Sequence, residues 1–412
     1  MLLKTKLNQI NWLLTIAAFY AFQFMSNWKL LSITGIHAPT DFADLKAILQ
    51  SADCVSNNHL NFFGALKGSS CFGYQYSREL IFVLHNLGAT ASSYRILGVI
   101  LTVASIAVFA SLASEVTKKS DLKTKILVAL IIFSPPTWLL IERGNLDLLI
   151  FDLAYFAYRT YRRYPNLSFA FIAVASLIKF YPLPLLIIYL LRRGHAGARI
   201  TRLIVFLLLT CDIYIQTSSL PKAADTWYVS FGSPIPGRYF NLFLKYAHQL
   251  KYSLSFELSA LLGYGILFLL TISILKLNSK AFWRVSALRL SEPANIESRQ
   301  NIFLLIFIVC FFAGMNYDYR LIFLIFGVLE PVSIAYSSGK RFIPCLAIAS
   351  LWLTDFSFGL GTKVFLVLQV IGDISLLAFV SILLANYITS LKIYAVTFST
   401  LPRRVFEFVI HP

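Results

Sequence analysis

Charged residues are scarce in this 412-residue chain, since Asp, Glu, Lys and Arg make up 13% of it and hydrophobic residues 58%. Soluble domains carry about 25% charged residues, so this composition excludes a soluble domain of such length. Apolar runs of roughly 15 to 22 residues recur from end to end, which is typical of multi-pass helical membrane proteins. We therefore predict an all-α integral membrane protein in which residues 1–412 form a single polytopic domain.

Several catalytic and binding motifs are also missing. The chain contains no P-loop, no convincing GxGxxG, no HExxH, and no His or Cys cluster with zinc-ligand spacing. These absences argue against a nucleotide cofactor, a tightly held transition metal and a pump with its own ATPase. We predict no cofactor.

Cysteine is rare as well, with five residues in the chain. Cys54 and Cys71 fall in the same predicted outer loop. A disulfide between them stays open, because spacing alone does not determine pairing. The other cysteines lie in apolar runs, where a cysteine behaves as a small hydrophobic residue.

Acidic residues number 19 against 36 Lys and Arg, which gives a formal net charge of +17. The basic residues cluster between apolar runs instead of forming one patch. About twelve spans with both termini in the cytoplasm place most clusters inside, as the positive-inside rule expects. The charge therefore reflects topology, and we predict no nucleic-acid partner.

Two predicted outer loops are long enough to hold structure, residues 26–94 and residues 218–253. In the first loop, DFADLKAIL and SRELIFVLHNL show apolar residues at helical spacing, which predicts short helices along the membrane surface. The second loop contains TWYVSFGSPIPGRYFNLF, whose aromatic, Gly and Pro content is typical of a binding loop.

The spacing of the basic clusters makes one pair of spans unusually short. About 28 residues separate Arg163 from Arg192, whereas two crossings need about 40. The turn IKFYPLP between them, and the turns IERGNLD and NYDYR of two neighbouring hairpins, are therefore expected to be recessed below the outer surface. Irregular backbone at that depth must be buried in protein or line a water-filled cavity.

We accordingly predict one outward-facing cavity with a polar floor. Three cations at one depth suit an anion such as a lipid phosphate. The alternative is that Arg143 pairs with Asp147 or Glu142, and Arg320 with Asp318, merely to tie hairpins together. The floor residues are Glu142, Arg143, Asn145, Asp147, Lys179, Tyr181, Asn316, Asp318 and Arg320.

Two further groups of carboxylates attract attention. Asp41 and Asp44, in HAPTDFADLK, could act as a general base near a cationic cavity. The competing interpretation is that they are first-turn helix residues favoured by the helix dipole. Acidic residues in or beside apolar runs are interpreted as hydrogen-bonding groups between helices. They are Asp152, Asp212, Glu330 and Asp373.

The stretches ERGNLDLLIFDLAYFAY, ASLIKFYPLPLLIIYLLRR and NYDYRLIFLIF resemble membrane glycosyltransferases of the GT-C fold. The resemblance is to glycosyltransferase family 87, which is polyprenyl-phosphate-sugar dependent and mannosyltransferase-like. It extends from about Asp41 to about Leu329. It implies a hexosyl- or pentosyltransferase that moves a sugar with inversion from a polyprenyl-phosphate donor to a glycan or glycolipid hydroxyl on the extracytoplasmic face.

The resemblance also implies roles for residues. The base of the family maps to Asp44 or to Asp41, and family members in which this aspartate precedes an aromatic favour Asp41. Because the donor phosphate is already esterified, no metal is expected. The donor phosphate would contact Arg143, Lys179 and Arg320, with support from Glu142, Asn145, Asp147, Tyr181, Asn316, Asp318, Tyr76 and Arg238.

Two rival functions use similar scaffolds. A transporter or flippase of lipid-linked glycans would profit equally from a cationic outward cavity, and polysaccharide polymerases or ligases use related multi-span architectures. Compact loops and the lack of an endoplasmic-reticulum retention tail favour a bacterial inner membrane.

Overall fold

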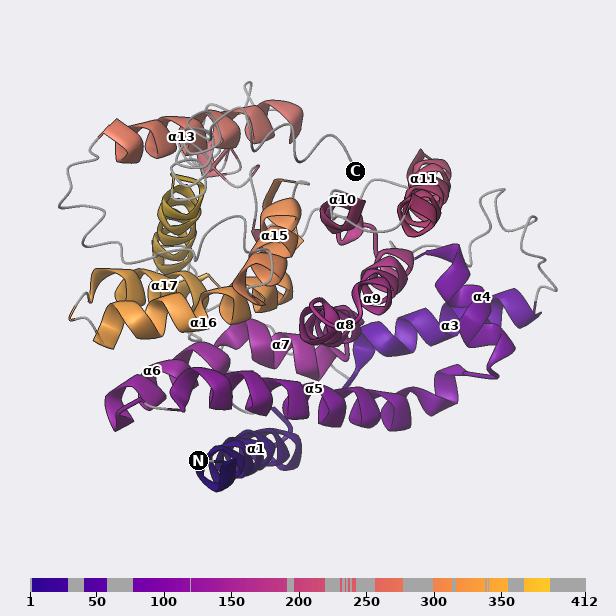
Figure 1. The fold of residues 1–412 in the computed structure, drawn as a ribbon, viewed down its shortest axis with the longest axis horizontal. Helices are drawn as coiled ribbons and strands as arrows, with labels where there is room; N and C mark the ends of the chain where they lie inside the picture. The colour runs from indigo at the N-terminus through magenta and orange to yellow at the C-terminus, as the bar shows by residue number, and fades with distance from the viewer. Residues whose placement is uncertain are drawn as a thin grey trace.

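The structure is a computed structural model whose regular elements are helices, apart from one two-stranded ladder in the described residues (Figure 1). Cys71, Tyr76 and Arg238 lie outside the described residues, and only the backbone is described for 316–319. The described residues are 2–28, 41–57, 77–118, 120–190, 196–218, 230–231, 234, 236–237, 239–241, 256–276, 299–312, 316–337, 339, 341–354 and 367–385.

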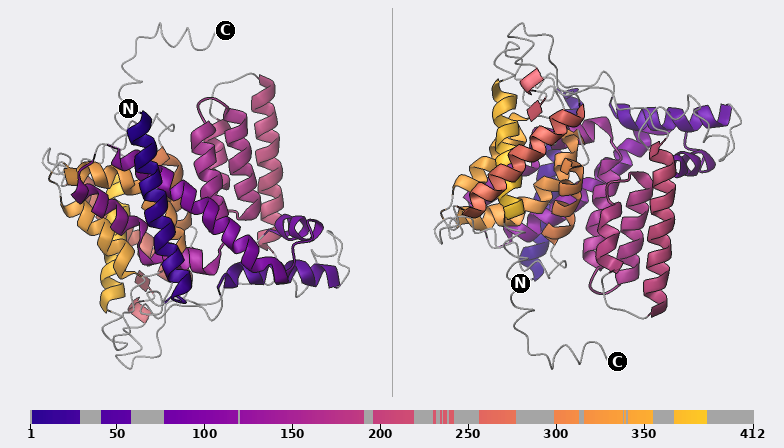
Figure 2. Two further views of the ribbon diagram at one scale, coloured as in Figure 1. Left: turned by 90° about the horizontal axis from the view of Figure 1, so that it is seen from below. Right: turned by 90° about the horizontal axis from the view of Figure 1, so that it is seen from above.

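Helix α1 (Leu2–Met25) packs along α5 (Tyr94–Thr117). Trp12, Ile16 and Tyr20 follow each other at intervals of four residues and are all buried, which gives α1 one apolar face toward the protein. Polar contacts fix the alignment, because Trp12 Nε1 donates to Thr117 Oγ1 at 2.8 Å. Helix α1 begins at the end of the molecule opposite to α3 and α4 (Figure 2).

The predicted first outer loop contains the two predicted surface helices, α3 (Ala43–Asn57) and α4 (Arg78–Asn86). Leu45, Ile48 and Leu49 lie on one side of α3 and are buried, and α3 packs on α4. Ser77 caps α4 by accepting a hydrogen bond from the N–H of Leu80. Both helices lie across one end of the helices Pro165–Ile178 and Ala196–Ser218 (Figure 2), as expected for helices along a membrane surface.

After α5, the chain forms helices that are joined by short turns. Helix α6 begins after Asp121, whose side chain accepts from the N–H of Thr124, and α7 follows a bend of 46°. Helix α7 ends at Gly144 in the left-handed region. The elements are α6 (Leu122–Ile132), α7 (Pro135–Arg143), α8 (Asp147–Thr160), α9 (Pro165–Ile178), the 3-10 helix η4 (Leu183–Leu185), α10 (Leu186–Leu190) and α11 (Ala196–Ser218).

Among the later elements, α16 (Ile322–Ser337) packs against α15 (Arg299–Phe312), α6 and α5. The rings of Phe109 in α5 and Phe326 in α16 stack at a centroid distance of 4.9 Å and so join these two helices. A 3-10 helix η3 (Ala91–Ser93) leads into α5. The remaining elements are β1 (Ser230–Phe231), α13 (Phe256–Lys276), α15 (Arg299–Phe312), β2 (Asn316–Tyr317), the 3-10 helix η6 (Asp318–Leu321), α16 (Ile322–Ser337), α17 (Phe342–Leu353) and a helix at Val367–Ala385.

The apolar helices agree with the membrane-protein class. Three described helices, at Ala91–Thr117, Leu258–Lys276 and Val367–Ala385, are long and apolar enough to cross a membrane, and the bent pair α6–α7 adds a fourth. The 14 residues of α9 rise only about 21 Å, less than a hydrocarbon core of about 30 Å. The spacing of the basic clusters predicts short helices here, and α9 is such a helix. The total of about twelve spans stays a prediction.

Most of the acidic residues in apolar runs do join elements by hydrogen bonds. Ser105 of α5 donates to Asp152 of α8 at 2.9 Å. Asp212 of α11 contacts Arg78 of α4 at 3.2 Å, and Asp373 accepts from Tyr239. The interpretation as interhelical groups is confirmed for Asp152, Asp212 and Asp373.

The loop disulfide is tested only in part. Cys54 is disulfide-bonded, and its predicted partner lies outside the described residues. Cys211, Cys310 and Cys345 are free thiols.

Close helix contact at Gly372 gives a testable prediction. A Cβ built there would lie 2.4 Å from the backbone nitrogen of Thr354, whereas a Cβ at Gly265 meets nothing within 4 Å. Gly372→Ala should lower the melting temperature in detergent, because overpacking costs roughly 1–3 kcal/mol. The matched control Gly265→Ala should leave it unchanged or raise it, since Ala favours helix by roughly 0.5–1 kcal/mol. Equal melting temperatures would contradict the close approach.

Candidate functional site

Polar residues from three hairpin turns meet in one cluster, although they are far apart in the sequence. Lys179, which ends α9, places Nζ 2.6 Å from Asp147 Oδ1 and 2.8 Å from Asn145 Oδ1. Arg320, in η6, places Nε 3.2 Å from Asp147 Oδ2. The structure therefore brings together Asn145, Asp147, Lys179 and Arg320 from the predicted floor of the cavity.

Asp147 is the centre of this cluster. It begins α8, directly after the turn at Gly144, so its side chain faces the ends of α9 and η6. Besides Lys179 and Arg320, Tyr181 Oη donates to Asp147 Oδ1 at 2.9 Å, and the guanidinium of Arg320 lies 5.3 Å from the Tyr181 ring centroid. Burying this carboxylate is tolerated because cations and hydrogen-bond donors surround it.

Asn145 joins this centre to a carboxylate of α3. Its Nδ2 donates to Asp44 Oδ2 at 2.6 Å, while its Oδ1 accepts from Lys179. Arg143 Nη1 lies 3.3 Å from Asp44 Oδ1. Asp44 sits in the first turn of α3, so the start of this helix is held directly on the turn that follows α7.

Solvent access divides the cluster into two parts. We call Asp147, Lys179 and Arg320 the buried hub, because their side-chain exposures are 0%, 4% and 11%. We call Asp44 and Arg143 the rim pair, with 22% and 32%. A ligand that approaches the cluster therefore reaches the rim pair first.

Other predicted residues lie in different places. Asp41 is not among the hydrogen bonds of the cluster; its Oδ1 accepts from Trp28 Nε1 at 2.7 Å. Glu142 is fully buried, with Oε2 4.0 Å from Arg143 Nε. The side chains of Asn316 and Asp318 are not described, and Tyr76 and Arg238 lie outside the described residues.

The cations of the cluster are already paired with carboxylates. Arg143 contacts Asp44 and approaches Glu142, and Arg320 contacts Asp147. Lys179 likewise contacts Asp147, so each of these three cations already contacts a carboxylate. An incoming anion must therefore displace one carboxylate from its cation, and the exposed rim pair is the place where this costs least.

One contact of the site was missed at the sequence level. The backbone of β1, in the predicted second outer loop, pairs antiparallel with β2 in the NYDYR turn, with Ser230 opposite Tyr317 and Phe231 opposite Asn316. The run WYVSF, rich in β-branched and aromatic residues, carried the signal for a strand. Residues Ser230 and Phe231 therefore reach the same hairpin as Arg320.

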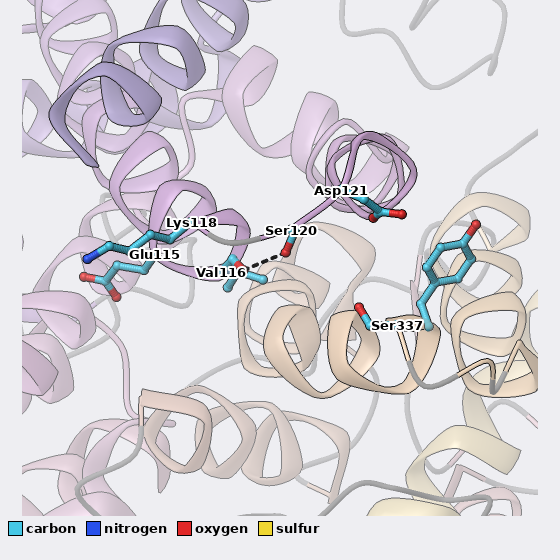
Figure 3. Close-up of a pocket in the computed structure, with 7 residues that line it drawn as sticks. Glu115, Val116, Lys118, Ser120, Asp121 and Ser337 are labelled. Atoms are coloured by element: carbon cyan, nitrogen blue, oxygen red, sulfur yellow. Dashed lines mark hydrogen bonds between the residues drawn. The ribbon is translucent and has the colours of Figure 1, made fainter. Parts of the chain in front are cut away.

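A separate cavity of about 610 Å³ lies at the far end of α5 (Figure 3). Its lining includes Glu115, Ser120, Asp121 and Ser337. Glu115 is paired with Arg159, and the hydrogen bonds of Asp121 with Thr124, which lower its pKa, serve to cap α6. Residues Ala91–Thr117 span about 40 Å of helix, so this cavity belongs to the end of the molecule away from Asp44.

Comparison with known families decides the class of protein. The model of glycosyltransferase family 87 matches residues 79–292, more than half of the chain. The chain belongs to glycosyltransferase family 87. The matched residues of this glycosyltransferase include Arg143, Asn145, Asp147 and Lys179 of the cluster, while Asp44 lies before them and Arg320 after them. The chain matches no curated protein and no solved structure.

The buried hub predicts a large stability effect in the glycosyltransferase. Asp147→Asn removes the carboxylate that both Lys179 and Arg320 contact, and breaking a buried ion pair costs roughly 3–5 kcal/mol. The melting temperature in detergent should fall sharply. Glu115→Gln is the matched control, because its pair with Arg159 is exposed and such pairs contribute about 0–1 kcal/mol. Equal losses in the two variants would contradict the role of the hub.

Proposed function

We propose that this glycosyltransferase moves a hexose or pentose from a polyprenyl-phosphate-linked donor to the hydroxyl of a glycan or glycolipid, with inversion, on the extracytoplasmic face. The observation that supports this most is the rim pair, which places a carboxylate beside an accessible guanidinium and above two enclosed cations. Family membership supports glycosyl transfer, and the cations at the end of an apolar bundle favour a lipid phosphate as donor.

Donor binding is proposed to separate the rim pair. The phosphodiester carries one negative charge, and the planar guanidinium of Arg143 can bind two of its oxygens. Arg143 then exchanges the carboxylate of Asp44 for the phosphate. Lys179 and Arg320 stay on Asp147 and stabilise the charge that gathers on the leaving phosphate, as preorganised groups in a protected site do.

The released carboxylate of Asp44 serves as general base. It takes the proton from the acceptor hydroxyl as that oxygen attacks the anomeric carbon. The bond between this carbon and the phosphate oxygen breaks on the opposite side, and its electron pair leaves with polyprenyl phosphate. Attack opposite the leaving group inverts the anomeric centre. Asp41, whose Oδ1 is held by Trp28, is the alternative base.

The orientation in the membrane forms part of the proposal. Helix α1 begins at the end of the molecule opposite to α3, whose first turn carries Asp44 (Figure 2). A cytoplasmic N-terminus, which the positive-inside rule favours, therefore fits a site on the outer side. A cytoplasmic C-terminus is proposed from the same rule, and a bacterial inner membrane is proposed from the compact loops.

Amide replacements distinguish the two candidate bases. With full-length protein in liposomes, Asp44→Asn should lower kcat by about 10² to 10⁴, the usual contribution of a general base, while donor binding is retained. Asp41→Asn should have a smaller effect. Asp53→Asn is the matched control on α3, since Asp53 accepts from the N–H of Ala91 instead of joining the cluster. Loss with Asp41→Asn alone would transfer the role to Asp41, and activity in both variants would contradict a carboxylate base here.

Chelation tests the metal-free step. Because the donor phosphate is esterified and three cationic side chains belong to the cluster, release of polyprenyl phosphate should continue at an unchanged rate in excess EDTA. The measurement is the free lipid phosphate formed from a panel of polyprenyl-phosphate sugars. Inactivity in EDTA that magnesium restores would contradict this step, and lipid movement across the bilayer without any release would favour the flippase alternative.

A further inference from the structure

Phe42 adopts an unusual backbone conformation directly before α3. Its φ is +55°, in the left-handed region that a bulky aromatic residue rarely occupies. The side chain is 2% exposed. Such a conformation persists only where the surrounding structure imposes it, and it occurs often at functional sites.

Two glycines make room for the Phe42 ring. A Cβ built at Gly98 of α5 would lie 2.5 Å from ring atoms of Phe42, and a Cβ built at Gly144 would lie 2.8 Å from its Cδ1. Real side chains essentially never approach so closely, so each position admits only glycine while the ring stays in place. The ring therefore fills a slot between α5 and the end of α7.

The backbone of Phe42 is held from the same side. Its N–H donates to the carbonyl oxygen of Glu142 at 2.6 Å, and its own carbonyl accepts from the N–H of Lys46 at 2.9 Å, which starts the hydrogen bonding of α3. Phe24 of α1 packs on the ring at a centroid distance of 5.5 Å. The first turn of α3 therefore has its position set by Phe42.

The segment 142–145 contacts Phe42 and Asp44 in alternation. The carbonyl of Glu142 and the Cα of Gly144 face Phe42, while the side chains of Arg143 and Asn145 contact the carboxylate of Asp44. A shift of Phe42 in its slot would consequently move Asp44 relative to the cations.

We propose that Phe42 is a positioning residue, which fixes Asp44 on Arg143 and Asn145 by filling the slot between Gly98 and Gly144. The inference rests on the proposed function for its catalytic consequence, but the placement of Asp44 can be measured without any sugar transfer. A misplacement of about 1 Å costs roughly 100-fold in rate, so a loosened Phe42 should lower kcat by about that factor.

Disulfide trapping measures the placement directly. In full-length Asp44→Cys/Asn145→Cys protein, mild oxidation should form a 44–145 disulfide, quantified by mass spectrometry of the linked peptides. Phe42→Ala empties the slot, and Gly98→Ala pushes the ring out while leaving Phe42 intact. Both changes should slow formation of this disulfide by about 10-fold or more, in line with the sensitivity of reacting pairs to geometry.

Controls separate placement from general loss of stability. Phe169→Ala removes a buried ring near Tyr189, away from the cluster, and Gly265→Ala adds a methyl group in open space. Phe169→Ala should lower the melting temperature without slowing the 44–145 disulfide, and Gly265→Ala should change neither. If Phe42→Ala does not fold, Gly98→Ala carries the test alone.

The outcomes are distinct. The inference is supported if the 44–145 disulfide forms more slowly in both slot variants. The single variants Phe42→Ala and Gly98→Ala, which keep Asp44, should then show a lower kcat and a nearly unchanged KM. Trapping at the unmodified rate in folded slot variants overturns it. Slower trapping with no sugar transfer by the unmodified protein supports the placement and contradicts the proposed reaction.

Discussion

The described part of the site depends on one buried carboxylate. Asp147 has no exposed surface, and it holds Lys179 and Tyr181 of one turn and Arg320 of another in one cluster. Neither two enclosed cations nor an enclosed carboxylate would be stable alone, because the desolvation of each would be uncompensated. The turn at Gly144, which brings Asp147 to the start of α8, is thus a condition for the whole arrangement.

The separation of the cluster into a buried hub and a rim pair explains how it can be both rigid and reactive. The buried hub fixes the positions of Lys179 and Arg320, so little reorganisation is needed when charge develops nearby. The rim pair is more exposed, and its partners can be exchanged for a ligand. Asn145 connects the two parts, since one end of its amide contacts Lys179 and the other contacts Asp44.

Much of this site follows from the sequence, because residue counts between basic clusters constrain helix length. That constraint placed IERGNLD, IKFYPLP and NYDYR at one depth, and the short α9 agrees with it. Family membership is confirmed by the match over residues 79–292. Surface helices α3 and α4 were predictable from apolar spacing, which depends on local periodicity alone.

Other features required three dimensions. The choice of Asp44 as the partner of Arg143 depends on how α3 docks, and docking depends on a slot made by Gly98 and Gly144, which are 46 residues apart in the chain. Sequence spacing does not reveal such long-range fits. The pairing of β1 with β2 was not predicted for the same reason, since each strand has only two residues and its partner strand is distant in the sequence.

The exchange of partners at Arg143 is the central claim, and a cryo-EM structure of the full-length protein with a polyprenyl-phosphate sugar tests it most directly. We expect the phosphate on Arg143, the carboxylate of Asp44 turned toward the anomeric carbon, and the contacts of Asp147 with Lys179 and Arg320 unchanged. A donor phosphate bound elsewhere, with the pair of Asp44 and Arg143 intact, would contradict the account.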